Sequence, residues 1–165
     1  MADNENLENE NVEKVRKIIK GTRIAMLTHQ DEDGHLVSRP MATQEVDFDG
    51  TVRFIAERAS DQGLAIQKNP EVNVAYSGSG SWVSLCGTAR IVNDPDKLRE
   101  LWSSFTDSWL EGGPENPNNV LIEIDAHTAE YWDTPGGSKI TQVANLLKTR
   151  VTGETVEGDS GVVNL

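Results

Sequence analysis

Six short strand-like segments run through this chain, and turn-forming residues separate several of them. Alternation of apolar and polar residues places the apolar side chains on one face of a half-buried β-strand. Asp-Glu-Asp-Gly at residues 31–34 and Asp-Gly at 49–50 are tight-turn sequences, so the first three segments are predicted to form an antiparallel meander. The predicted strands cover residues 23–29, 35–41, 51–57, 72–76, 82–92 and 120–132.

Apolar residues at helical spacing occupy the stretches around these strands. The first predicted helix ends at Gly21, and the second is capped by Ser60 and ends at Asn69-Pro70. Asp94 with Pro95 begins a third, and Ser138 caps a fourth. Six strands with short helices between them predict a mainly β fold, a small antiparallel barrel with flanking helices. The predicted helices cover residues 7–20, 61–68, 94–105 and 138–150.

Charge is distributed unevenly along the 165 residues, whose formal net charge is −12. Residues 1–13 carry five acidic and no basic side chains, and residues 153–165 carry three acidic and no basic ones. We expect a disordered tail over residues 1–6, one domain over 7–152 and a flexible acidic tail over 153–165. Nucleic acid is not an expected partner, because phosphate binding requires clustered lysine and arginine.

Several other function classes have little support in the sequence. The single Cys86 and the polar, acidic start of the chain predict a cytoplasmic protein without disulfides. No apolar run approaches the length of a membrane span, about 20 residues, and the three histidines share no metal-ligand spacing. Tryptophans are expected to anchor the core, except Trp109, which precedes a Gly-Gly-Pro loop and is placed to reach a ligand or a second subunit.

Residues 35–41, His-Leu-Val-Ser-Arg-Pro-Met, form the most unusual predicted strand. Alternation puts Arg39 on a face otherwise made of Val37 and Met41, where a guanidinium needs an anionic partner or solvent. Pro40 cannot donate to a ladder, which predicts an edge strand. Taken alone, an edge arginine paired with a surface carboxylate explains this pattern.

A second interpretation joins this strand to the helix after the third strand. In a meander, Arg39 lies beside the strand that leads to Arg58 and Ser60, and a helix start presents free N–H groups and partial positive charge. Arg39, Arg58 and Ser60 are therefore predicted to converge on a phosphate, with Met41 below a flat ring.

The order of short motifs over residues 10–133 resembles the general stress proteins of the FMN-binding split-barrel group, which are related to pyridoxamine 5′-phosphate oxidase. None of the motifs is diagnostic alone, and the resemblance lies in their number and order. They are Ser38-Arg-Pro-Met41, Phe54-Ile-Ala-Glu-Arg58 with Ser60, Asn69-Pro70, Trp82-Val83 with Gly87, Leu101-Trp102, Trp109 with Gly113, and Glu130-Tyr-Trp132.

The resemblance implies a six-stranded antiparallel split β-barrel that forms a homodimer with two FMN sites at the interface. It implies that Ser60 meets the phosphate and that Trp109 lies in a loop covering the flavin. The residues that it places along the flavin come from the second and third strands: Ser38, Arg39, Pro40, Met41, Phe54, Ile55 and Ala56.

The chain departs from the family pattern at two positions of this implied site. Ala56 stands where relatives often have threonine, and Gln62 stands where they commonly have a phosphate-binding lysine, for which Arg58 is a candidate substitute. A charged hydrogen bond contributes about 1.5–3 kcal/mol, so this loss would weaken FMN binding about tenfold or more. The sequence leaves open an FMN-dependent oxidoreductase, a deazaflavin-dependent reductase of the same fold, and a non-enzymatic flavin-binding stress protein.

Overall fold

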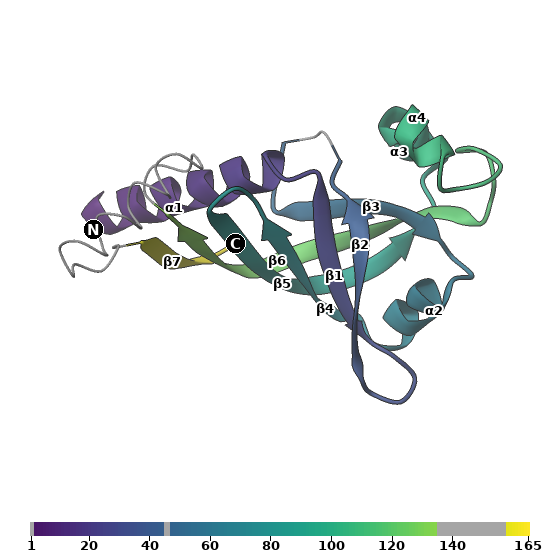
Figure 1. Cartoon of the computed structure of the whole chain (residues 1–165), viewed down its shortest axis with the longest axis horizontal. Helices are drawn as coiled ribbons and strands as arrows, with labels where there is room; N and C mark the ends of the chain where they lie inside the picture. The colour runs from purple at the N-terminus through teal and green to yellow at the C-terminus, as the bar shows by residue number, and fades with distance from the viewer. Residues whose placement is uncertain (1, 45–46, 135–157) are drawn as a thin grey trace, which may run out of the picture.

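The computed structural model describes residues 2–44, 47–134 and 158–165, with side chains from residue 9 onward. In this part of the chain seven antiparallel strands form one sheet in the order β2-β1-β4-β5-β6-β3, with β7 paired to β6 (Figure 1). The strands are β1 (Ile24–Gln30), β2 (Leu36–Ala42), β3 (Thr51–Glu57), β4 (Glu71–Ser77), β5 (Ser81–Val92), β6 (Asn119–Asp133) and β7 (Asp159–Asn164).

All six predicted strands are present, but the predicted meander is wrong. Strand β3 pairs along its length with β6, as in Phe54 opposite Ile122, and not with β2. Of the two connections in that meander, β1–β2 is a hairpin, whereas between β2 and β3 the chain passes to the other end of the strand order. Strands β2 and β3 therefore lie at opposite ends of the strand order and approach each other without pairing. The fold is mainly β and the barrel is split rather than closed, as predicted.

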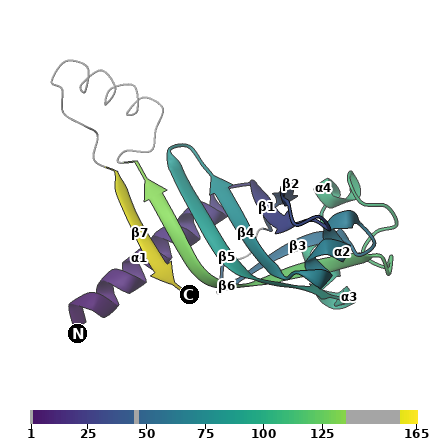
Figure 2. The same ribbon diagram turned by 90° about the horizontal axis from the view of Figure 1, so that it is seen from below.

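One face of the sheet forms the core together with helix α1 (Ala2–Lys20). Val15, Ile18 and Ile19 of α1 are buried against it. Figure 2 shows α1 crossing behind β7 and β6, and the Tyr131 hydroxyl on β6 donates a hydrogen bond of 2.8 Å to the Asn11 amide oxygen.

Both ends of the chain are more structured than the sequence predicted. Helix α1 begins at Ala2 rather than at residue 7, and residues 2–20 contain no glycine or proline to interrupt it. Strand β7 lies within the stretch that we expected to be loose, and its Val163 is buried against the core. The predicted helix at 138–150 lies outside the described residues, and one domain over residues 7–152 remains a prediction.

Helix α2 (Asp61–Lys68) confirms its prediction at both ends and is held close to the end of β3. The Ser60 hydroxyl accepts a hydrogen bond from the Gly63 N–H at 3.1 Å and donates to the Glu57 carbonyl at 2.7 Å. A Cβ at position 63 would lie 2.5 Å from the carbonyl oxygen of Arg58, so only glycine allows this approach. Cap and glycine together fix where the first turn of α2 lies.

The predicted third helix divides in two. Helix α3 (Pro95–Leu101) starts at its expected cap, because the Asp94 carboxylate accepts from the Lys97 N–H. It ends at Trp102, and Ser103 caps the short α4 (Ser104–Asp107). At Gly87 the β5–β6 register shifts, and a Cβ there would lie 2.3 Å from the Asp125 carbonyl oxygen, so glycine allows this close approach.

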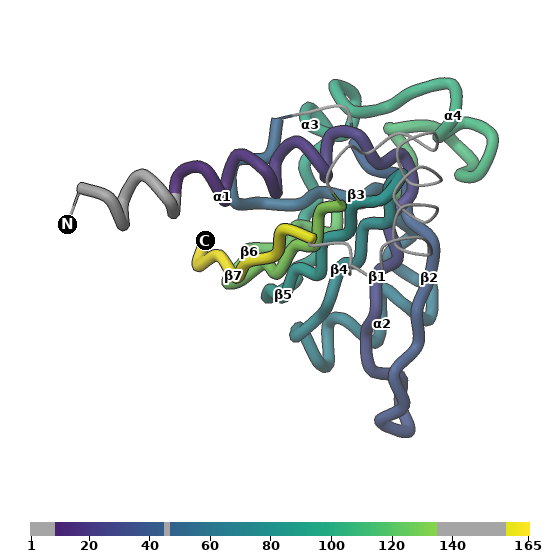
Figure 3. The backbone as a smooth tube through the Cα atoms, turned by 60° about the vertical axis from the view of Figure 1, so that its left-hand side comes forward, coloured from purple at the N-terminus to yellow at the C-terminus, as the bar shows by residue number. Residues whose placement is uncertain are grey.

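The β1–β2 hairpin projects beyond the rest of the sheet on the side where α2 lies (Figure 3). This arrangement leaves a space between the hairpin and the helix. Among the helices that the structure describes, none is both long and apolar enough to cross a bilayer.

Candidate functional site

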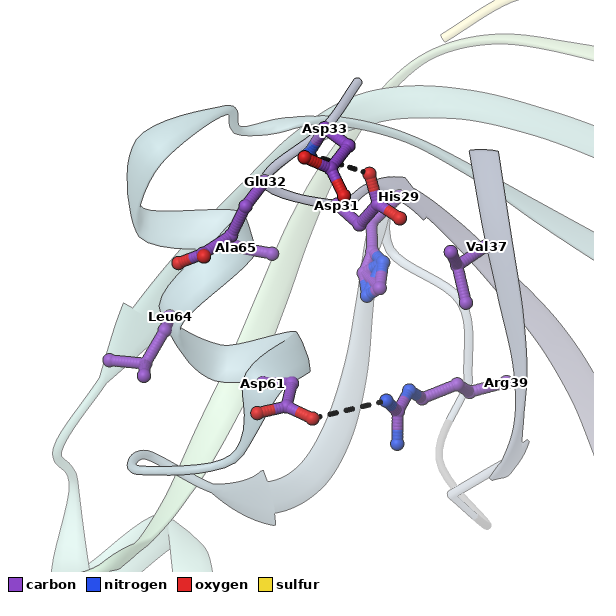
Figure 4. A pocket seen from close by; sticks show the side chains of 9 residues that line it. All are labelled: His29, Asp31, Glu32, Asp33, Val37, Arg39, Asp61, Leu64 and Ala65. Carbon is purple, nitrogen blue, oxygen red and sulfur yellow. Dashed lines mark hydrogen bonds and ion pairs between the residues drawn. The ribbon is translucent and has the colours of Figure 1, made fainter. Parts of the chain in front are cut away.

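A pocket of about 340 Å³ lies between the β1–β2 hairpin and α2 (Figure 4). Its volume falls at the lower end of the range of small-ligand sites. Side chains from both strands, from the hairpin turn and from the helix line it: His29, Asp31, Glu32, Asp33, Val37, Arg39, Asp61, Leu64 and Ala65.

Arg39 enters this pocket because β2 alternates between its two faces. Val37, Arg39 and Met41 lie opposite His29, Leu27 and Ala25 of β1, on the inner face of the sheet. The Arg39 Nη2 is 3.9 Å from the Asp61 Oδ2, which makes a long ion pair. The Asp61 side chain is 95% exposed. Solvent screens such a pair strongly, so the guanidinium remains available to a better-placed anion.

His29 is the most deeply buried polar residue of the pocket. Its side chain is only 3% exposed, and within the described residues neither ring nitrogen has a hydrogen-bond partner. Burial lowers the pKa of His29, the Arg39 charge lowers it further, and Asp31 opposes them. The ring is therefore neutral at pH 7, with one unsatisfied donor and one unsatisfied acceptor inside the pocket.

Carboxylates surround the mouth of the pocket, and most of them have partners of their own. The Asp31 carboxylate accepts the N–H groups of Asp33 and His35 at 3.0 and 2.8 Å, which lowers its pKa and closes the hairpin turn. Glu32 pairs with Lys68 of α2 at 2.9 Å.

Asp31, Asp33 and His35 bring three possible metal-ligand atoms within 4.8 Å of one another. The turn hydrogen bonds explain this cluster, and its Asp33 and His35 members are exposed. We assign no metal ion to it.

The sequence predicted that Arg39, Arg58 and Ser60 converge on a phosphate. Of these, the structure brings Arg39 to the start of α2. Ser60 lies there too, but its hydroxyl proton already bonds the Glu57 carbonyl, so as oriented it offers no donor to a ligand. Gln62 is 5% exposed, and its Nε2 has no partner among the residues that the structure describes.

The predicted strand residues divide between the two faces of the sheet. Ser38 and Pro40 are exposed on the outer face, where the Ser38 hydroxyl is 2.8 Å from that of Thr28. Met41, Phe54 and Ala56 are buried in the core, and the half-buried Ile55 packs against a second cluster around Leu98, Leu101 and Leu121. A ligand that meets residues of both strands would have to lie along the edges of β2 and β3, which in the described structure pair with β1 and β6 respectively.

Arg58 and Trp109 do not reach the pocket within one chain. Arg58 is exposed, and its backbone N–H donates to the Asn118 carbonyl at 2.8 Å. Trp109 is 73% exposed beyond α4, with its ring centroid 6.1 Å from that of Phe105. A role for Trp109 over a bound flavin therefore requires a second copy of the chain.

Sequence reasoning considered His29 as a metal ligand, found no ligand spacing, and missed its place in the pocket. The available signal was its alternation with Ala25 and Leu27, which puts the histidine on the same face of β1 as these two apolar residues. The hairpin then places that face beside Arg39.

Comparison with known proteins agrees with this architecture. The model of the family described as pyridoxamine 5′-phosphate oxidase like matches residues 10–157. Protein bli-3 of Neurospora crassa is 26% identical over 155 residues, which cover 87% of this chain and 74% of that protein.

Solved structures show the same fold. A candidate general stress protein 26 from Jannaschia sp. CCS1 has a TM-score of 0.77 at 24% identity, covering 95% of this chain and 99% of that one. The general stress FMN/FAD binding protein of Xanthomonas citri is 32% identical, with a TM-score of 0.62 over 73% of this chain and 86% of that one. The chain therefore belongs to the pyridoxamine 5′-phosphate oxidase-like family, as its motifs indicated.

Proposed function

We propose that this chain is an FMN-binding flavoprotein that holds the phosphate of the cofactor between Arg39 and the first turn of α2. The observation that carries the proposal is the approach of Arg39 to the first turn of α2, where its Nη2 lies 3.9 Å from the side-chain carboxylate of Asp61, the first residue of the helix. Both features attract a phosphate, through the guanidinium charge and through the partial positive charge and free N–H groups of the helix.

The buried polar groups near α2 are compatible with this ligand. The Gln62 amide is a buried donor without a partner in the described structure, at the position where relatives commonly have lysine. A neutral amide donates one hydrogen bond to phosphate without the charge of lysine, so we expect moderate rather than tight binding. The relative from Xanthomonas citri named as FMN/FAD binding supports a flavin as the ligand class.

FMN, when bound, supplies hydride or electron transfer at its ring. The residues of this chain bind and orient it: Arg39 and α2 hold the phosphate end, and the free edges of β2 and β3 flank the split where the ring would lie. An oxidoreductase reaction would follow from this arrangement, with the substrate set by the surroundings of the ring.

Titration of the purified protein with FMN, followed by flavin fluorescence, tests the proposal. The variant Arg39→Ala should weaken binding about tenfold or more, because a charge-assisted contact is lost. Arg99→Ala is the matched control, since it removes an exposed arginine on α3 that pairs with Asp96 and Glu115. Equal affinity of wild type and Arg39→Ala, or no flavin binding, would refute the proposal.

The second candidate function is a deazaflavin-dependent reductase, and the same titration with a deazaflavin cofactor distinguishes it from an FMN-binding protein. Gln62 in place of lysine favours a ligand whose phosphate lies elsewhere. Preference for the deazaflavin, with no loss in Arg39→Ala, would support that candidate instead. A bound flavin that no nicotinamide donor reduces would indicate a non-enzymatic stress protein.

We also propose that the functional unit is a cytoplasmic homodimer, with the outer face of the sheet as its interface. Several side chains on that face are apolar and exposed, notably Trp82 opposite Trp132. Ile24, Met26 and Val162 extend the same face across β1 and β7. A second copy covering it would bury this surface and complete the site with Trp109. Light scattering at micromolar concentration should give twice the chain mass.

A further inference from the structure

We propose that His29 is a second ligand of the anion that Arg39 binds, and that its ring takes up a proton from solvent when a phosphate monoester enters the pocket. The proposal rests on the proposed function for the choice of phosphate monoester. It adds a residue and a proton to that function, neither of which the family resemblance implies.

The position of the ring carries the inference. His29 and Arg39 project from adjacent strands onto the same face, two positions apart in the ladder, and Figure 4 shows both side chains directed into one pocket. The opposite wall is α2, where Asp61 lies at the first turn and Ala65 one turn further on. An anion held by Arg39 at the start of α2 would therefore lie in the same pocket as the imidazole.

The lack of protein partners shows that this histidine is not a satisfied core residue. Both ring nitrogens are buried without hydrogen bonds in the part of the chain that the structure describes. A buried polar group without a partner is unfavourable unless water or a ligand supplies the bond. The pocket beside it is large enough for a phosphate group, which accepts several hydrogen bonds.

A bound anion would shift the balance of charge around the ring toward protonation. The groups facing the ring are Arg39 from β2, Asp61 from α2, and Asp31, Glu32 and Asp33 from the turn. Asp31 accepts two turn N–H groups and Glu32 pairs with Lys68, while burial and Arg39 keep the ring neutral. A phosphate would replace Asp61 as the partner of Arg39 and neutralise the guanidinium charge. It would also add a negative charge near the imidazole, beside that of Asp31. Both changes raise the affinity of the ring for a proton.

Proton NMR of the three histidine rings tests this directly on the wild-type protein. Inorganic phosphate is the first probe and FMN the second, each titrated between pH 5 and pH 8. We expect either ligand to move the His29 signals and to raise the pKa of that ring. The His127 ring, which bonds the Thr88 hydroxyl on the outer face, should not respond and serves as the internal control.

Variants then measure the contribution to affinity. His29→Gln should weaken FMN about tenfold at pH 6, where a protonated ring would donate a charge-assisted bond, and less at pH 8. Arg99→Ala, the exposed α3 variant that serves as the control for Arg39→Ala, should bind as wild type does. The phosphate of FMN also titrates, with a second pKa of about 6. Its titration affects both proteins equally, so it cancels in the ratio of their dissociation constants for FMN.

The outcomes separate this inference from the proposed function. FMN binding that depends on Arg39 but leaves the His29 ring unchanged would overturn the inference alone. A His29 ring that responds to phosphate in a protein that does not bind FMN would overturn the flavin proposal and keep the inference for another phosphate ligand. A ring that responds to neither probe, in a protein that does not bind FMN, overturns both.

Discussion

Asp61 competes with any anionic ligand for the Arg39 guanidinium. Its carboxylate lies 3.9 Å from Arg39 and at the positive end of α2, where a phosphate is also expected. Asp61→Asn should therefore raise the affinity for FMN or inorganic phosphate, about two- to fivefold, as expected for an exposed pair worth up to about 1 kcal/mol.

The same substitution should lower the free energy of unfolding slightly, by about 0.3–1 kcal/mol, because the acidic residue stabilises the helix start. Asp96→Asn is the matched control: it removes an exposed carboxylate from the first turn of α3 and also breaks a pair with an arginine. It should show the stability loss without the gain in affinity. Weaker anion binding in Asp61→Asn would contradict the assignment of the pocket.

The buried His29 should make stability depend on pH in a defined direction. Its pKa is lowered in the folded protein, so below about 6.5, the ordinary histidine value, the unfolded chain binds the proton more readily. The stabilisation is complete above that value and is lost as the pH falls further. Denaturant unfolding of wild type should show this loss between pH 7.5 and pH 5.5, and His29→Gln should show less of it. Identical pH dependence of the two proteins would contradict the buried, neutral ring.

Added phosphate distinguishes the two states of the ring. At pH 5.5 it should restore part of the lost free energy of unfolding in wild type, because it stabilises the protonated form in the folded protein. The same addition should have less effect on His29→Gln.

Sequence alone could predict Arg39 but not its neighbour in the pocket. An arginine between Val37 and Met41 breaks an apolar pattern visibly, whereas a histidine is found both buried and exposed. Recognising His29 required knowing which face of β1 is buried, and alternation shows only which residues share a face. For the same reason Trp82 and Trp132 were predicted to lie in the core, whereas both are exposed.

At the scale of elements, the position of helix α2 beside Arg39 depends on a close backbone approach at Gly63. Alanine normally improves a helix over glycine by roughly 0.5–1 kcal/mol. At position 63, however, a Cβ would lie 2.5 Å and 2.8 Å from the carbonyl oxygens of Arg58 and Glu57. Gly63→Ala should therefore destabilise the protein, by about 1–3 kcal/mol, and should weaken anion binding by moving the helix start away from Arg39.

Gly78→Ala provides the control for this prediction. Its Cβ would meet its nearest atom at 3.5 Å, an ordinary contact, and the residue has no positive φ. We expect a change within about 0.5 kcal/mol, typical of a surface substitution. Thermal or denaturant unfolding measures both variants, and a Gly63→Ala protein as stable as wild type would show that α2 can shift without loss.

Elements were predictable where local signals were strong, and their pairing was not. Ser60, Asn69-Pro70 and Asp94-Pro95 fixed helix ends through caps and prolines, and turn residues fixed the β1–β2 hairpin. Residues 43–50 contain an Asp-Gly pair but connect strands at opposite ends of the sheet, so a turn sequence did not imply a hairpin. Strand β7 was missed because its pairing with β6 is a long-range contact within an acidic stretch.

At the scale of the whole molecule, the split between β2 and β3 and the apolar outer face both leave the fold incomplete in a single copy. Two exposed tryptophans, Trp82 and Trp132, lie opposite each other on β5 and β6 of that face. Buried aromatic residues contribute strongly to interfaces, often 2 kcal/mol or more each. Trp132→Glu should therefore raise the dissociation constant of the proposed dimer roughly thirtyfold or more, and light scattering over a concentration series would measure the shift toward monomer.

The Trp132→Glu variant also tests whether FMN binding depends on formation of the dimer. Trp109 lies away from the pocket within its own chain, so its predicted contact with the cofactor exists only in a dimer. Trp132→Glu should then weaken FMN binding at low protein concentration and recover as the concentration rises. Lys17→Glu, which introduces the same carboxylate at an exposed position of α1 on the core side of the sheet, should leave the dissociation constant unchanged. Full FMN affinity in a monomeric Trp132→Glu protein would show that one chain holds the cofactor by itself and would remove Trp109 from the site.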